Sequence, residues 1–235
     1  MTTVLLVRHG VTDANRSGVL AGWSPGVHLA DKGREQAAAL ATRLASIPVA
    51  AIVSSPLERC VETADALAAG RDVTVETDDG LGECRYGDWT GQELKKLAKD
   101  PLWKVVQAHP SAATFPGGEA LRDTQTRAVD AVRRINERLG PDATWIAVSH
   151  GDVIKSILAD ALGLHLDLFQ RIQADPCSLS VVRYTTLRPF VVRMNDLGGA
   201  VDDLRPPAGR SRSGRSRAKR ASSDAVVGGG SGRIG

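Results

Sequence analysis

The sequence predicts an α/β protein, a three-layer α/β/α sandwich around a mostly parallel sheet. Short β-rich runs alternate with long helical patterns, which is the rhythm of parallel strands joined by covering helices. The chain has 235 residues, 42% hydrophobic and 24% charged, which is the balance of an ordinary globular protein with one sizeable core. We therefore expect one catalytic domain over residues 1–197, followed by a tail over residues 198–235.

The alternation can be followed along the chain. The first half is expected to contain strands at 3–7, 51–54 and 73–76 and helices at 31–46 and 57–69. In the second half, helices are expected at 119–139 and 152–162, with a buried strand at 145–149 between them. Two last strands, 179–184 and 190–194, are joined by a turn that contains Pro189, and we expect them to form a hairpin at the sheet edge.

An irregular segment interrupts the pattern between residues 80 and 118. It is rich in Trp and Pro, and a helix is expected at 90–100. In an α/β fold such a segment tends to lie over the ends of the strands. We expect it to act as a lid or as a wall that selects the substrate.

The tail differs in composition from the rest of the chain. It holds eight Lys/Arg against three Asp, whereas the rest holds 22 basic and 24 acidic residues. It is dominated by Gly, Ser, Arg and Pro, so it is expected to be disordered. A nearly neutral body gives no reason to expect nucleic acid as a partner, beyond a weak salt-sensitive contact of the basic stretch 205–220.

Other features exclude several classes of protein. Cys60, Cys84 and Cys177 are odd in number and far apart, which supports neither a disulfide framework nor a zinc site. The apolar run at 4–7 is too short for a signal peptide, and no run approaches the roughly 20 residues of a membrane span. A cytoplasmic protein is expected.

Two predicted strands end in the same way. The strand at 3–7 leads into Arg8-His9-Gly10, and the strand at 145–149 leads into His150-Gly151. In open parallel sheets the carboxyl ends of the strands line the ligand crevice. We therefore expect both imidazoles at one rim of the sheet.

A third strand, 51–54, leads into a helix whose first turn would contain Arg59. The free N–H groups of that turn favour an anion, and the planar forks of Arg8 and Arg59 suit phosphate oxygens. No Asp/His metal cluster and no Gly-Lys-Ser/Thr phosphate loop is present, so no metal and no cofactor are expected. A neutral imidazole is a competent nucleophile for phosphoryl transfer.

Such chemistry also needs an acid for the leaving alcohol and a base for water, and one carboxyl can serve in turn as both. Glu83 is the candidate, because it comes just past the predicted strand at 73–76 and burial near phosphate would raise its pKa. Asp79 and Asp88 are rivals on the residues alone.

These residues belong to stretches that occur together in one known family. They are Arg8-His9-Gly10 with Thr12 and Asn15, Gly33 with Gln36-Ala37, Ser54-Ser55-Pro56-Leu57 with Arg59 and Thr63-Ala64, Glu83 with Gly87 and Gly91, Pro116-Gly117-Gly118-Glu119, and Val148-Ser149-His150-Gly151. In this order they resemble the histidine phosphatase superfamily, in its phosphoglycerate mutase-like branch.

The resemblance implies a phosphoglycerate mutase-like fold and a set of roles. His9 would be the phosphorylated nucleophile, Glu83 the proton donor and acceptor, and Arg8, Arg59 and His150 the clamp on the phosphoryl group. Asn15 and Gly151 would add contacts to the phosphate. The sequence departs from the family pattern at Val11, at 26–30 and at Asp152. These positions are expected to flank the pocket mouth and to bear on specificity. His28 is expected to be an exposed loop residue.

We therefore expect a metal-independent phosphatase of the histidine acid phosphatase type, acting on a small phosphorylated metabolite. A phosphomutase is the alternative, but it needs a second anionic pocket with further cations. The lysines of the 85–118 segment do not indicate such a pocket, because they have the spacing of a solvated helix face. A non-catalytic phosphate-binding protein is disfavoured because no key residue is lost. The substrate stays open, and so does the oligomeric state, a homodimer included.

Overall fold

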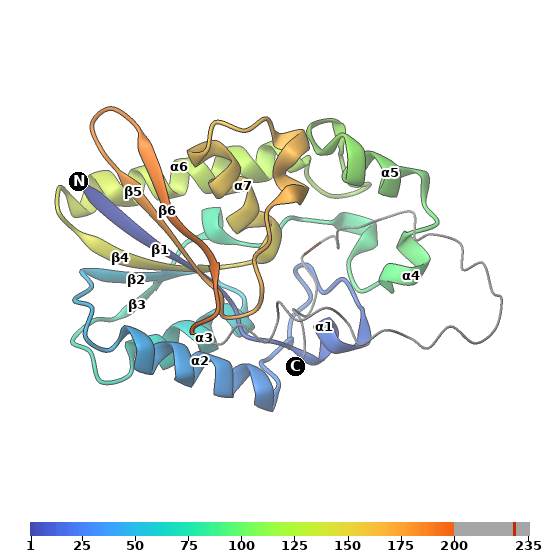
Figure 1. The fold of residues 1–235 in the computed structure, drawn as a ribbon. Helices are drawn as coiled ribbons and strands as arrows, with labels where there is room; N and C mark the ends of the chain where they lie inside the picture. The colour runs from blue at the N-terminus through green and yellow to red at the C-terminus, as the bar shows by residue number, and fades with distance from the viewer. Residues whose placement is uncertain (200–227, 229–235) are drawn as a thin grey trace, which may run out of the picture.

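A six-stranded sheet forms the centre of the molecule in the computed structural model, which describes residues 1–199 and Gly228 (Figure 1). Its strand order is β3-β2-β4-β1-β5-β6. The strands are β1 (Thr2–Arg8), β2 (Ala51–Ser54), β3 (Val75–Thr77), β4 (Thr144–Ser149), β5 (Leu179–Tyr184) and β6 (Pro189–Asp196). The expected strands are thus all present.

The pairing is mostly parallel. β1 pairs with β4, β4 with β2, and β2 with β3, all in parallel, whereas β5 runs antiparallel to both β1 and β6. The expected hairpin of the last two strands is confirmed, with β6 at the sheet edge and β5 beside β1. This arrangement puts the strand that carries Arg8 in the interior of the sheet.

Helices cover both faces, which confirms the three-layer sandwich. Figure 1 shows α2 (Asp31–Leu44) and α3 (Glu58–Ala68) on one face and α6 (Leu121–Leu139) and α7 (Gly151–Ala161) on the other. Alternate residues of the central strands supply the two cores: Val4 and Leu6 belong to one, and Leu5 and Val7 to the other. Burial on both faces explains why these strands are continuous apolar runs.

The segment between residues 80 and 118 differs from the expectation. The predicted helix at 90–100 is wrong: α4 covers only Leu94–Leu97, and a separate α5 runs from Pro101 to Ala108. Proline favours the first turn of a new helix, and the Asp100 side chain caps that turn by accepting the N–H of Leu102 at 2.8 Å. Short 3-10 turns occupy Asp79–Leu81, Gly87–Trp89 and Pro110–Ala112, and another lies at Leu166–Arg171.

A short helix that the sequence pattern did not reveal, α1 (Asp13–Ser17), follows β1 closely. The Thr12 side chain caps it by accepting the Asn15 N–H, and the Asn15 side chain accepts the Thr12 N–H. Together these two bonds form a capping box. This box fixes Asn15 next to the end of β1.

The predicted tail falls almost entirely outside the described residues, so its expected disorder stays a prediction. Gly228 is described, and its N–H donates to Oδ2 of Asp152 at 2.8 Å. Within the described part of the chain, none of the helices is long and apolar enough to cross a membrane.

Candidate active site

Three neighbouring strands end at one rim and deliver the polar residues of the site. His9 follows β1, Ser55 follows β2 and His150 follows β4, and the parallel register pairs Arg8 with Ser149 and Ser54 with Val148. The ladder continues one step further, because the His9 N–H donates to the Ser149 carbonyl at 3.0 Å. The two imidazoles are therefore brought together as expected, with ring centroids 5.2 Å apart.

His9 is held as a neutral imidazole with a defined tautomer. Its ring is 2% exposed, and Nδ1 lies 2.7 Å from the carbonyl oxygen of Gly10, so Nδ1 carries the proton and Nε2 the lone pair. Burial lowers the pKa of His9 well below its ordinary value, and the charges of Arg59 and Arg8 lower it further. The ring is thus a nucleophile at neutral pH.

A close backbone contact fixes the loop that carries His9. A Cβ atom on Gly10 would lie 2.6 Å from the carbonyl oxygen of Gly33 in α2, and one on Gly33 would lie 2.2 Å from the carbonyl oxygen of Val11. Only glycines permit this approach. The Gly10 N–H also donates to Oγ1 of Thr63 at 3.1 Å, so α2 and α3 both hold the loop.

Arg59 brings a buried positive charge to the same place. It is the second residue of α3, as predicted, and only 2% exposed. Nη2 donates to the Gly22 carbonyl at 2.9 Å and lies 3.2 Å from Nδ1 of His150. Nη1 is buried and has no hydrogen-bond partner among the described residues. An unsatisfied guanidinium N–H in a pocket indicates a site for an anion.

The side chain of His150 is fully buried among hydrogen-bonding groups at the carboxyl ends of the strands. Its Nε2 lies 2.8 Å from Oγ of Ser55, and its Nδ1 lies 3.7 Å from Oε2 of Glu83. Burial lowers the pKa of His150 well below its usual value, and the charge of Arg59 lowers it further. Both imidazoles of the site are therefore neutral at neutral pH.

Glu83 is the buried carboxyl of the site. It is 4% exposed and follows the 3-10 turn Asp79–Leu81, whereas its rivals Asp79 and Asp88 are exposed. Burial raises the pKa of Glu83 to about 7, and the charge of Asp152 raises it as well, against the opposing effect of Arg59. A carboxyl with this pKa exchanges a proton readily near neutral pH.

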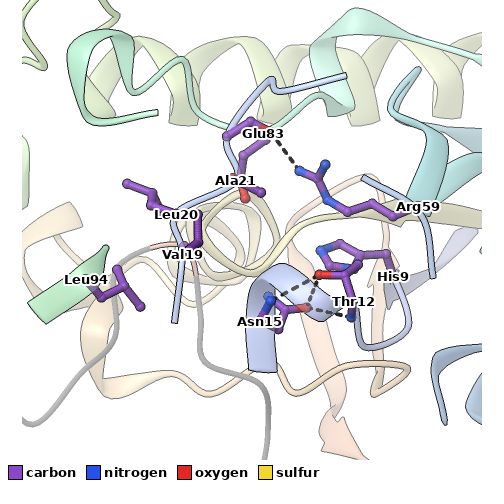
Figure 2. Close-up of a pocket in the computed structure, with 11 residues that line it drawn as sticks. His9, Thr12, Asn15, Val19, Leu20, Ala21, Arg59, Glu83 and Leu94 are labelled. Atoms are coloured by element: carbon purple, nitrogen blue, oxygen red, sulfur yellow. Dashed lines mark hydrogen bonds between the residues drawn. The ribbon is translucent and has the colours of Figure 1, made fainter. Parts of the chain in front are cut away.

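These side chains line one pocket (Figure 2). His9, Arg59 and Glu83 surround it, Asn15 and Thr12 come from the start of α1, and its apolar wall contains Val19, Leu20 and Leu94. Leu94 lies in α4, so the 80–118 segment does contribute to the wall. Gly228 also lines the pocket.

The remaining predicted residues lie close by with other partners. The Arg8 side chain is fully buried and donates to the Ala174 carbonyl at 2.8 Å, and its charge is felt at His9. Gly151 begins α7 directly after His150. His28 is exposed and contacts Glu62 away from the pocket.

Two residues near Glu83 were missed in the sequence. Trp23 donates through Nε1 to the Glu83 carbonyl at 2.6 Å, and Arg127 of α6 contacts the same oxygen at 2.8 Å. One signal was available for Arg127, because it is a charged residue on the helix face shared with the buried Thr124 and Ala131. Nothing in the local pattern singled out Trp23. Across residues 1–199 and Gly228, no group of three or more His, Cys, Asp or Glu is arranged to hold a metal ion.

Comparison with known proteins gives one consistent result. The model of the histidine phosphatase superfamily (branch 1) matches residues 4–197. The glucosyl-3-phosphoglycerate phosphatase of Mycolicibacterium vanbaalenii is 32% identical over 171 residues, which cover 70% of this chain and 76% of that protein. The structure of Bacillus stearothermophilus YhfR superposes with a TM-score of 0.78 at 30% identity, covering 83% of this chain and 98% of the other.

Some relatives are much longer. The bifunctional protein Rv2228c of Mycobacterium tuberculosis is 34% identical over 189 residues, which cover 78% of this chain but only 50% of that protein. The chain therefore spans about half the length of the first curated relatives that it matches.

Proposed function

The chain belongs to branch 1 of the histidine phosphatase superfamily, and on this basis we propose that it hydrolyses a small phosphomonoester through a phosphohistidine formed on His9. One observation carries the proposal. The neutral imidazole of His9, with its lone pair on Nε2, lines the same pocket as the unsatisfied Nη1 of Arg59 and the carboxyl of Glu83. These are the nucleophile, the anion clamp and the proton carrier of a phosphoryl transfer.

In the first step, Nε2 of His9 attacks phosphorus and the bond from phosphorus to the ester oxygen breaks. Protonated Glu83 gives its proton to the departing oxygen, so a neutral alcohol leaves. In the second step, ionised Glu83 takes a proton from water while the water oxygen attacks phosphorus. The P–N bond breaks, and inorganic phosphate and neutral His9 are released.

The phosphoryl oxygens gain negative charge that no metal neutralises in this scheme. Arg59 supplies the nearest fixed cation, His150 a second donor when its Nε2–H turns from Ser55 to the phosphate, and Arg8 a further buried charge that acts on His9. Asn15 and Gly151 complete the proposed set of phosphate contacts. The apolar wall of Val19, Leu20 and Leu94 is the place for the carbon skeleton of the leaving group.

Hydrolysis is favoured over mutase chemistry by the composition of the pocket. Among its described lining residues, Arg59 is the only Lys or Arg, so they offer a second phosphate no further fixed cation. A mutase must hold a bisphosphate and needs such a second anion subsite. The M. vanbaalenii relative is a phosphatase by name, which agrees with this choice. We also propose a cytoplasmic location, since Cys60, Cys84 and Cys177 are all free and buried.

The test is to trap the intermediate. The enzyme is mixed with a ³²P-labelled phosphomonoester, quenched in alkali and analysed for phosphohistidine, with and without chelator. We expect label on the wild type and on His28→Ala, whose histidine lies outside the pocket, and none on His9→Ala. Turnover by His9→Ala, or loss of wild-type activity in chelator, would exclude the proposal. Transfer of the label to an added alcohol or phosphoglycerate instead of water would identify a mutase.

A further inference from the structure

The guanidinium of Arg127 makes several hydrogen bonds to the backbone of the segment that carries Glu83. Arg127 lies in the first half of α6 and, unlike Glu83, is not among the residues that line the pocket. Its Nη1 lies 3.3, 3.0 and 2.8 Å from the carbonyl oxygens of Asp79, Gly80 and Gly82, and its Nη2 lies 2.8 Å from that of Glu83. One guanidinium thus binds four carbonyls of a five-residue turn.

Glu119 holds that guanidinium in place. Its two carboxylate oxygens accept from Nη2 and Nε of Arg127 at 2.6 and 3.1 Å, which is a bidentate pair. Burial alone would raise the pKa of Glu119, but the hydrogen bond and charge of Arg127 lower it below its ordinary value. Glu119 also accepts the N–H of Arg85 at 2.8 Å, so the pair fixes the backbone on both sides of Glu83.

The packing around the turn leaves little room for adjustment. A Cβ atom on Gly82 would lie 2.5 Å from the ring of Trp23. The Nε1–H of Trp23 shares the Glu83 carbonyl with Arg127. The Glu83 carbonyl is therefore held by two donors at once, an indole N–H and a guanidinium N–H.

The Glu83 carboxyl itself has few direct restraints. Among the described residues, Oε1 accepts only the N–H of the next residue, Cys84, at 3.0 Å, and Oε2 lies 3.7 Å from Nδ1 of His150. With so few bonds to the side chain, its position depends on the backbone that carries it. Proton transfer needs the carboxyl within about 3 Å of the leaving oxygen, and a misplacement of about 1 Å can cost on the order of 100-fold in rate.

We propose that Arg127 is a positioning residue for the proton transfer by Glu83, acting through the four backbone carbonyls of residues 79–83. The inference rests on the proposed function in that Glu83 is taken as the acid and base. Arg127 touches neither the phosphate nor the leaving group in this scheme. Replacement of Arg127 should therefore slow the reaction only for substrates whose leaving group needs a proton from Glu83.

Leaving groups of different basicity separate this role from a general loss of structure. An alkyl phosphate expels a strongly basic alkoxide and needs Glu83, whereas 2,4-dinitrophenyl phosphate expels a stable phenolate and does not. The ratio kcat/KM reports steps up to release of the alcohol. In Arg127→Met we expect kcat/KM to fall about 30- to 100-fold for the alkyl ester and less than about threefold for the dinitrophenyl ester.

Arg134→Met is the matched control. Arg134 lies seven positions further along α6, on the same side, and within the described part of the chain its side chain pairs with Asp78 at 2.9 Å rather than with the carbonyls of the turn. It should keep both values of kcat/KM. Arg127→Lys retains a charge opposite Glu119 but not the fork that reaches several carbonyls, so it should show the same selective loss in weaker form, and it serves if Arg127→Met does not fold.

A cycle with Glu83→Gln completes the test. If Arg127 acts through Glu83, adding Arg127→Met to Glu83→Gln costs no further activity on the alkyl ester. Equal losses on both esters, or additive losses in the cycle, would overturn the role of Arg127. Failure of the wild type to form phosphohistidine would instead refute the proposed function, so the two failures are distinguishable.

Discussion

The rings of His9 and His150 lie edge to face, at an interplanar angle of 61°, although the two residues are far apart in the sequence. Both are neutral and buried, and Arg59 contacts the second ring at 3.2 Å. A phosphoryl group bound to Nε2 of His9 would therefore lie close to the ring of His150 and the guanidinium of Arg59 without a rearrangement of the backbone. The site is organised before the substrate arrives.

The first prediction concerns the unsatisfied N–H of Arg59. Vanadate or phosphate at 100 times its dissociation constant should stabilise the wild-type protein by about 2.7 kcal/mol, because the anion binds only the folded state. In Arg59→Met this stabilisation should be almost lost, and kcat/KM should fall at least 100-fold. Thermal unfolding with and without anion measures it. Arg43→Met, on the exposed part of α2, is the control, and an Arg59 variant with full anion stabilisation would contradict the prediction.

The second prediction concerns pH. In the proposed mechanism the first step needs the acid form of Glu83, and burial with the charge of Asp152 raises the pKa of Glu83 to about 7. The value of kcat/KM for an alkyl phosphate should therefore decline as the pH rises through about 7, since the proton is lost. In Glu83→Gln this alkaline decline should disappear, and the value at pH 6 should be about 100-fold lower. An unchanged alkaline decline in Glu83→Gln would assign it to another group.

The third prediction concerns Asp152, which is fully buried and pairs with Lys155 at 3.0 Å and with the Tyr86 hydroxyl at 2.9 Å. Its charge raises the pKa of Glu83, so Asp152→Asn should lower that pKa. The alkaline decline of kcat/KM should then move to lower pH. Because Lys155 loses its carboxylate, unfolding should become easier by about 3 kcal/mol.

A double variant separates the two effects of Asp152. Asp152→Asn with Lys155→Met removes both charges, so it should recover stability but keep the shifted pH profile. Chemical denaturation and the pH dependence of kcat/KM measure the two quantities independently. A pH profile identical to that of the wild type in both variants would refute the electrostatic link.

The fourth prediction concerns Gly33 in α2. Helix propensity alone would make Gly33→Ala stabilising by about 1 kcal/mol. The added Cβ would lie 2.2 Å from the Val11 carbonyl oxygen, which is backbone and has to move. We therefore expect a destabilisation of about 1–3 kcal/mol and a fall in kcat, because the loop after His9 shifts. Lys32→Ala, at an exposed position of the same helix, should change neither.

The sheet and the rim could be predicted because their signals are local. Apolar runs that end in Arg8-His9-Gly10 and Ser149-His150-Gly151 mark both the strands and the place where they stop. The residues alone left Asp79 and Asp88 as rivals of Glu83, and the family resemblance strengthened the choice, since the burial of Glu83 depends on the packing of α6 against the preceding turn.

Other features depend on long-range contacts or on a misread boundary. The bonds from Arg127 to residues 79–83 join segments more than forty residues apart, so the position of Arg127 on the buried face of α6 does not indicate its partners. The prediction of one helix at 90–100 is wrong because a new helix begins at Pro101, with Asp100 as its cap. The sequence pattern placed the end of a helix at that point. Propensity located helical residues there but not the break between α4 and α5.

The strand order also governs how the chain acquires its shape during synthesis. β1 lies between β4 and β5, so during synthesis it has no neighbour in the sheet until residues 144–149 of β4 have been made, and its second neighbour only after residues 179–184 of β5. Such distant pairing makes folding slow and leaves the nascent apolar run of β1 exposed to aggregation. Chaperone demand during translation should therefore concentrate on this N-terminal strand.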